Sequence, residues 1–159
     1  MPTTLITGAS RGLGLEFARQ YAVDGWQVIA CCRDPERAAE LQSVARPGGA
    51  ITLETLDVAE GGSVAALARR LAGQPIDLLI NNAGLGQRGG DRLGEIDYEQ
   101  WQAALNTNTL GPVRVTEALI ENVAASQRKQ VITISSGLGS LAYTASQEIS
   151  GFGAAYQYR

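Results

Sequence analysis

The chain has 159 residues, of which 45% are hydrophobic and 18% charged, enough for one domain with a packed core over residues 1–159. A formal net charge of −3 argues against nucleic acid and against an anionic membrane as partners. The sequence has no histidine and no apolar run of bilayer length, which excludes a Ser-His-Asp triad, histidine-ligated zinc and a membrane span. We therefore expect a cytoplasmic protein without a metal site.

Apolar runs alternate with segments of helical periodicity along the chain. Strands are predicted at 3–7, 26–32, 51–56, 76–80 and 131–135. Helices are predicted at about 13–24, 34–46, 64–71 and 97–123, the last with a kink near Asn108 because Pro112 has no N–H group. This alternation indicates an α/β fold, a Rossmann-type doubly wound parallel sheet of about five strands in the order 3-2-1-4-5.

The only two cysteines, Cys31 and Cys32, are adjacent in the second predicted strand. Neighbouring side chains of a strand point to opposite faces of the sheet, so this pair is a poor candidate for a disulfide or a metal site. Two stretches have no clear periodicity: 85–96, which is typical of a surface loop, and 137–159.

The stretch from Thr7 to Gly14 joins the first strand to the first helix through three glycines. Glycine permits a tight turn, and the following helix N-terminus offers N–H groups and the positive end of a dipole. A strand, a glycine turn and a helix in this order are typical of a phosphate-binding site, although an ordinary connection can have the same pattern.

A second unusual turn, Asn81-Asn82-Ala83-Gly84, follows the fourth predicted strand. In a doubly wound sheet, ligands bind beyond the carboxyl ends of the strands, where the winding reverses. For the order 3-2-1-4-5 that place lies between strands one and four. The sequence therefore predicts that both turns meet at one crevice, with the Asn81 amide bracing neighbouring strands.

These turns and three further motifs resemble the short-chain dehydrogenase/reductase family, in particular its carbonyl-reductase-like branch. Residues 7–14 fit TGxxxGxG, Asp57 fits the acid after the third strand, and residues 81–84 fit NNAG. Residues 108–112 fit the family's helix asparagine and residues 134–136 its catalytic serine segment. The resemblance covers almost the whole chain. It implies hydride transfer between a nicotinamide dinucleotide and a small carbonyl or alcohol substrate, and a homo-oligomer.

The resemblance assigns cofactor binding to three segments and two separate positions. These candidates are Gly8, Ser10, Arg11, Gly12, Leu13, Gly14, Arg33, Asp57, Val58, Asn82, Ala83 and Gly84. The three glycines would cradle the pyrophosphate, and Asp57 would accept from the adenine amino group unless it only caps a helix. The Ala83-Gly84 backbone would line the nicotinamide ribose.

The choice between NADP and NAD is argued from charge. NAD-binding proteins place an acid at the end of the second strand, where this chain has Cys32 followed by Arg33. Arg11 lies inside the glycine turn, and two guanidinium groups can bind a 2′-phosphate. We therefore expect NADP. The opposing interpretation is that both arginines are only solvated, with Asp34 partly neutralising Arg33.

For catalysis, the resemblance assigns three residues. Ser136 would hydrogen-bond the substrate carbonyl, Tyr158 would donate the proton, with Tyr156 as second choice, and the Asn108 carbonyl would hold a relay water. The family's Tyr-x-x-x-Lys lysine has no counterpart, because the sequence stops at Arg159. We thus expect a C-terminally incomplete short-chain reductase that is inactive as this chain. The alternative is a nucleotide-binding or interaction module without turnover.

Overall fold

The computed structural model describes residues 1–46, 48–86, 94–136 and 140. Its sheet has five parallel strands in the order β3-β2-β1-β4-β5. The strands are β1 (Thr3–Thr7), β2 (Gln27–Cys32), β3 (Ile51–Thr55), β4 (Leu78–Asn81) and β5 (Gln130–Thr133). The predicted fold class and strand order are confirmed. Because β1 is the central strand, its carboxyl end is adjacent to those of β2 and β4.

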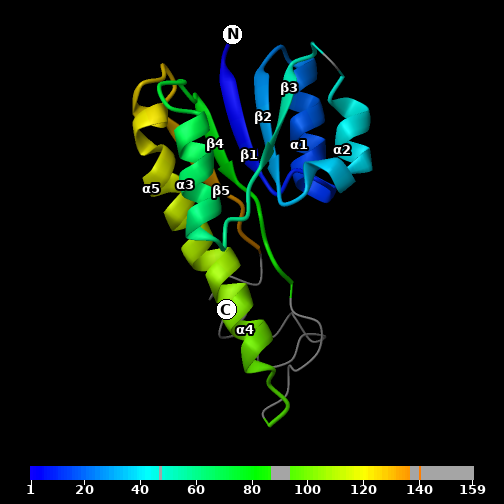
Figure 1. Ribbon diagram of the computed structural model, residues 1–159, viewed down its shortest axis with the longest axis vertical. Coiled ribbons are helices and arrows are strands. Elements are labelled where there is room, and N and C mark those ends of the chain that lie inside the picture. Colours follow the sequence, from blue (N-terminus) through cyan, green and yellow to red (C-terminus); the bar gives the residue numbers. More distant parts are fainter. Residues whose placement is uncertain (47, 87–93, 137–139, 141–159) are drawn as a thin grey trace.

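Helices cover both faces of the sheet, as Figure 1 shows. One face carries α1 (Gly12–Val23), the short 3-10 turn η1 (Pro35–Arg37) and α2 (Ala39–Val44). The other carries α3 (Gly61–Arg70) and α5 (Gly111–Ala124). Helix α4 (Tyr98–Leu105) extends past the carboxyl edge of the sheet and joins α5 through a π-helical turn, η2 (Asn106–Leu110).

The alternation of side chains along the strands divides the core into two layers. Leu5, Cys31 and Leu79 pack with α3 and α5, whereas Ile6, Cys32 and Ile80 pack towards α1 and α2. The two cysteines thus point to opposite faces, as predicted, and both are free thiols. Layers on both faces explain why the central strands are apolar at nearly every position.

The prediction of one continuous helix at 34–46 is wrong. The segment forms two separate elements, η1 and α2. Asp34 caps η1 as expected, since its carboxylate accepts from the Arg37 N–H at 3.2 Å. Ala38 then leaves helical geometry, with φ −86° and ψ 67°. The Gln42 side chain ties α2 to this turn, since its Nε2 donates to the carbonyl oxygens of Pro35 at 2.7 Å and Glu36 at 2.9 Å.

The long helix predicted at 97–123 is interrupted close to the expected position. Its first turn is capped by Asp97, which accepts from the Gln100 N–H at 3.0 Å. The interruption is the π turn η2, with Pro112 at the start of α5. Gly111 lets this turn pack closely, because a Cβ added there would lie 2.9 Å from a methyl group of Val58.

Strand β5 is the last strand of the described sheet, and all four of its residues are exposed. Val131 and Ile132 are 40% and 44% exposed, which makes this strand an apolar edge. Among the described residues, no helix has the length and apolarity needed to cross a bilayer.

Candidate functional site

A cavity of about 440 Å³ lies at the carboxyl ends of the central strands. Its volume is within the range of small-molecule sites. The lining comes from the glycine turn, the end of β2, the segment after β3, the turn after β4 and the π turn. The lining residues are Gly8, Ser10, Arg11, Gly12, Leu13, Cys32, Arg33, Leu56, Asp57, Val58, Asn82, Ala83, Gly84, Leu85 and Thr107.

The cavity brings together eleven of the twelve candidate cofactor residues, all except Gly14. It also includes Cys32, Leu56, Leu85 and Thr107, which were not predicted as site residues. Each of these four is next to a predicted position in the chain, so extending each motif by one residue would have found them.

The glycine turn has the backbone that a phosphate site needs. Gly8 and Gly12 have φ angles of +68° and +58°, which side-chain-bearing residues rarely adopt. Nothing lies within 4 Å of the position that a Gly12 Cβ would take, so the backbone there is open. Helix α1 has no side-chain cap and no acid in its first turn, so no carboxylate competes for an anion.

Gly14 brings α1 close to the two turns. It is buried in α1, and a Cβ there would lie 2.3 Å from the Gly8 carbonyl oxygen and 2.5 Å from Asn82 Nδ2. The third glycine therefore lets the helix pack closely against both turns. Gly14 is not among the residues that line the cavity, and its contact with a phosphate stays a prediction.

The two turns are joined by hydrogen bonds through Asn82. Its Nδ2 donates to the carbonyl oxygens of Thr7 at 3.0 Å and Gly8 at 3.2 Å. The Asn81 Nδ2 donates instead to Thr116 Oγ1 of α5 at 3.1 Å, and Asn81 Oδ1 is buried without a hydrogen bond among the described residues. The bracing between strands that was predicted for Asn81 thus belongs to Asn82, because Asn81 faces α5.

Two arginines line the cavity, Arg11 from the glycine turn and Arg33 directly after β2. Arg11 and Arg33 are both exposed, and neither side chain forms a hydrogen bond or ion pair with the described part of the chain. Asp34, the nearby acid, pairs with Arg37 at 3.4 Å. The predicted neutralisation of Arg33 by Asp34 is therefore not what the structure has. Both guanidinium groups have hydrogen-bond donors available for an anionic ligand.

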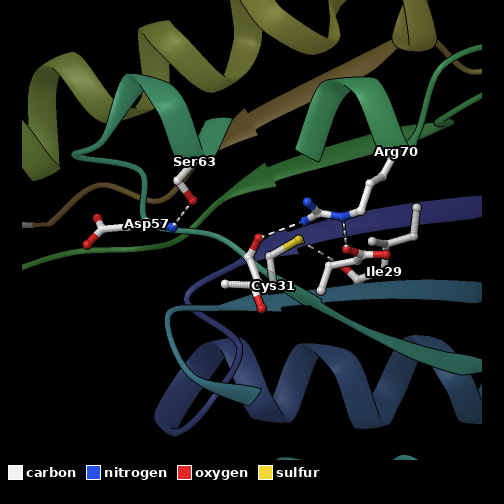
Figure 2. Close-up of polar contacts among 7 residues, drawn as sticks. Ile29, Cys31, Asp57, Ser63 and Arg70 are labelled. Atoms are coloured by element: carbon white, nitrogen blue, oxygen red, sulfur yellow. Dashed lines mark hydrogen bonds and ion pairs between the residues drawn. The ribbon is translucent and has the colours of Figure 1, made fainter. Parts of the chain in front are cut away.

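Asp57 lies on the adjacent wall. Its carboxylate accepts from the Ala59 N–H at 2.9 Å, and its own N–H donates to Ser63 Oγ of α3 at 2.9 Å. The N-cap of α3 is Glu60, so the alternative role of Asp57 as helix cap is not adopted. Figure 2 shows the Asp57 carboxylate directed away from Ser63. The acid is thus fixed by a local turn while it lines the cavity.

Cys32, the last residue of β2, lines the cavity next to Arg33. Burial raises the pKa of its thiol above the ordinary value. Burial also raises the pKa of Cys31, which is completely enclosed in the opposite layer. Both thiols are therefore protonated near neutral pH and act as small apolar side chains.

The π turn supplies the wall at the β4 end. Thr107 lines the cavity, while the Asn108 side chain binds the backbone of Leu85 on both sides. Its Oδ1 accepts from the Leu85 N–H at 2.7 Å and its Nδ2 donates to the Leu85 carbonyl oxygen at 3.0 Å. Asn108 thereby fixes the segment that follows Gly84.

The predicted catalytic residues are only partly described. Ser136 is exposed and follows β5 by three residues, at the same carboxyl edge as the cavity. Tyr158 and Tyr156 lie outside the described residues. In the part of the chain that the structure describes, no three acidic, cysteine or histidine residues are grouped so as to hold a metal ion.

A five-stranded parallel sheet with a glycine turn and a cavity at its switch point defines the class of Rossmann-like dinucleotide-binding proteins. Within this class, the chain belongs to the short-chain dehydrogenase family, since residues 2–150 match the family described as short chain dehydrogenase. The family consists of oxidoreductases, and the relatives described next are named dehydrogenases or reductases.

Bovine retinol dehydrogenase 8 is 34% identical over 142 residues, which cover 86% of this chain and 45% of that protein. A probable NADP-dependent dehydrogenase of Haemophilus influenzae is 32% identical over 151 residues, 94% of this chain and 59% of that protein. A carbonyl reductase from Pseudomonas aeruginosa PAO1 in complex with NADP has a TM-score of 0.82 and 32% identity, covering 99% of this chain and 71% of that chain. The chain thus spans about half the length of the curated relatives it matches.

Proposed function

We propose that this chain binds NADP(H) as the cofactor-binding part of an oxidoreductase. That enzyme transfers hydride between the nicotinamide and a carbonyl or alcohol carbon. The observation that carries the proposal is the cavity that Arg11 and Arg33 both line. Their guanidinium groups have no partner among the described residues, and Cys32 stands where NAD-binding proteins have an acid. The NADP in the P. aeruginosa carbonyl reductase, which has the same fold, supports this choice.

The parts of a dinucleotide fit different walls of the cavity. The diphosphate fits the open backbone at Ser10–Leu13 and the N-terminus of α1. The adenosine end with its 2′-phosphate fits the side of Arg11, Arg33 and Asp57. The nicotinamide end then fits the side of Ala83 to Leu85 and Thr107.

The catalytic roles follow from the family resemblance and remain proposals. Bound NADPH supplies the hydride. The Ser136 hydroxyl hydrogen-bonds the substrate oxygen, Tyr158 donates the proton that completes the alcohol, and the Asn108 carbonyl holds a water that returns a proton to the tyrosine. Pro112 supports the last role, because without its N–H the Asn108 carbonyl has no α-helical donor.

The proposal is tested by titrating the chain with NADPH and NADH in parallel. Replacing Arg11 and Arg33 by alanine should weaken NADPH binding about 10- to 100-fold for each lost charged contact, with little effect on NADH. Arg37→Ala is the matched control, since Arg37 lies in the same region but pairs with Asp34 and does not line the cavity. An unchanged ratio of NADPH to NADH affinity in the double variant would contradict the 2′-phosphate assignment.

A gain of NAD preference is a stronger form of the same test. Cys32→Asp with Arg33→Ala places a carboxylate at the end of β2, where it can accept from a ribose 2′-hydroxyl and repels a 2′-phosphate. We expect this variant to prefer NADH. Turnover is followed by the absorbance of reduced nicotinamide with aldehydes, ketones and quinones. Binding without turnover would favour the alternative of a nucleotide-binding module.

Homo-oligomerisation also remains a proposal. The exposed edge strand β5 and the exposed apolar residues Leu110, Val113 and Ile120 near it support self-association. Sedimentation velocity over a range of concentrations measures the assembly state.

A further inference from the structure

We propose that Arg114 is a positioning residue that fixes the π turn Asn106–Leu110 and thereby the wall of the cavity formed by Thr107 and Leu85. The inference rests on the proposed function, since it assigns this wall to the nicotinamide end of NADP(H). Arg114 lies on α5 and does not itself line the cavity.

The guanidinium of Arg114 joins two segments that are far apart in the sequence. Its Nη2 donates to Asn106 Oδ1 at 2.6 Å, and its Nη1 lies 3.4 Å from the Asn106 carbonyl oxygen. The same Nη1 donates to the Val58 carbonyl oxygen at 3.2 Å. Asn106 completes the bridge, because its Nδ2 donates to the Ala59 carbonyl oxygen at 3.3 Å. The start of the π turn is thus attached to the segment after β3.

These contacts act where the helical hydrogen bonds change register. The Asn106 carbonyl accepts from the Gly111 N–H, five residues ahead, as in a π-helix. A half-buried guanidinium is a second donor to that carbonyl, which favours the wider turn. An extended planar donor suits this bridge, because it reaches two segments at once.

Two residues of the π turn connect it to the cavity wall. Thr107 lines the cavity directly. Asn108 fixes the backbone of Leu85 through two hydrogen bonds, at 2.7 and 3.0 Å. If the turn relaxed to an α-helical register, both side chains would rotate about the helix axis and this wall would move. On the adenosine side, Arg11 and Arg33 take no part in these contacts, which touch that side only through the backbone of Val58 and Ala59 next to Asp57.

The experiment compares Arg114→Met, Arg114→Lys and Asn106→Ala with the unmodified chain. Two ligands are titrated: NADPH, which fills both ends of the cavity, and adenosine 2′,5′-bisphosphate, which fills only the adenosine end. Amide hydrogen exchange of the free protein reports the π turn without any ligand. Arg69→Met is the matched control, because Arg69 is an exposed arginine of α3 whose side chain makes no hydrogen bond with the described residues.

We expect Arg114→Met and Asn106→Ala to weaken NADPH binding about tenfold, the scale of one charged hydrogen bond, and to change adenosine 2′,5′-bisphosphate binding by less than about twofold. Exchange should rise at the Leu110 and Gly111 amides but not at Leu119. Arg114→Lys should restore part of the NADPH affinity, since an ammonium can still donate to one carbonyl. A merely structural arginine would change the melting temperature without this difference between ligands.

Equal losses for both ligands, or unchanged exchange at Leu110 and Gly111, would overturn the inference. So would full NADPH affinity in both variants. If the unmodified chain binds adenosine 2′,5′-bisphosphate and NADPH equally well, the nicotinamide end makes no contact with this wall and the positioning role is lost. Failure of the unmodified chain to bind either ligand would overturn the proposed function itself, which keeps the two failures apart.

Discussion

Thr7 and Asn82 are hydrogen-bonded to one another twice. The Asn82 N–H donates to Thr7 Oγ1 at 3.0 Å, and Asn82 Nδ2 donates to the Thr7 carbonyl oxygen at 3.0 Å. The Thr7 hydroxyl also accepts from the Ala83 N–H at 3.0 Å and lies 3.4 Å from the Ile80 carbonyl oxygen. One buried hydroxyl thus satisfies the backbone where the central strand and β4 both end.

Replacing Thr7 by valine should therefore be costly despite the nearly equal volume. The change leaves the two N–H groups of Asn82 and Ala83 without their acceptor, and we expect the free energy of unfolding to fall by about 2–4 kcal/mol. Thr7→Ser is the matched control, because it keeps the hydroxyl and loses one methyl group, at a cost of about 1 kcal/mol. Urea denaturation measures both. Equal losses for the two variants would show that the hydroxyl is not what stabilises the turns.

Gly14→Ala tests whether the third glycine acts through helix packing. Its Cβ would lie 2.3 Å from the Gly8 carbonyl oxygen, a backbone atom that cannot turn aside. We expect α1 to shift and the protein to lose about 3 kcal/mol or more. Gly62→Ala in α3 is the control, since nothing lies within 4 Å of that position and alanine favours a helix. If the Gly14→Ala variant had normal stability but bound NADPH weakly, this result would favour a direct contact between Gly14 and the phosphate.

The strand order and the place of the cavity could be predicted because local patterns determine them. Alternation of apolar strands with amphipathic helices leaves few topologies, and one of these brings the turns after β1 and β4 together. The predicted candidates that do line the cavity all lie in segments directly after a strand, except those already in the first turn of α1.

What could not be predicted depends on contacts between segments distant in sequence. Gly14 and Gly12 look alike in a motif, yet only Gly14 packs against Asn82, 68 positions away in the numbering.

Asn81 and Asn82 are adjacent amides that cannot be told apart in the sequence. Because the sheet lies between α1 and α5, the Asn82 side chain faces Thr7 and the Asn81 side chain faces Thr116. The bridge from Arg114 to Val58 has no local signal, because it joins a helix to the segment after β3.

The cysteines give a chemical test of the cavity. Cys32 lines it and Cys31 is enclosed in the opposite layer, so the single-thiol variants Cys31→Ala and Cys32→Ala isolate each environment. Burial raises both thiol pKa values, so iodoacetamide should react slowly with either folded variant.

We expect the remaining thiol of Cys31→Ala to react faster than that of Cys32→Ala, with the rate measured by intact-protein mass spectrometry. NADPH should slow only the reaction of Cys32, because only this thiol lies on the cavity wall. Equal protection of both thiols would mean that NADPH acts by general stabilisation. No protection of Cys32 would place the nucleotide away from the end of β2.

The hydrogen bonds of the Asp77 carboxylate predict how the free energy of unfolding changes in acid. Its carboxylate accepts from the Thr3 N–H at 2.9 Å and from the Arg128 N–H at 3.3 Å. The Thr3 hydrogen bond, with smaller contributions from the Arg128 and Gln127 N–H groups, holds the pKa of Asp77 below its ordinary value. A carboxyl with a lowered folded-state pKa stabilises the fold above its unfolded-state pKa, and this contribution disappears as the pH falls through the folded-state pKa.

Asp77→Asn should therefore reduce the urea midpoint at about pH 7. The difference from the unmodified protein should shrink as the pH falls below about 4, the ordinary pKa of an aspartate, because the unfolded chain binds the proton before the folded one does. Asp24→Asn is the control, because the exposed Asp24 side chain accepts no hydrogen bond within the described part of the chain. Its midpoint should follow the unmodified protein at every pH. A deficit in Asp77→Asn that stays constant down to pH 3 would show that shape or packing at the start of β1, and not the charge, stabilises this end of the sheet.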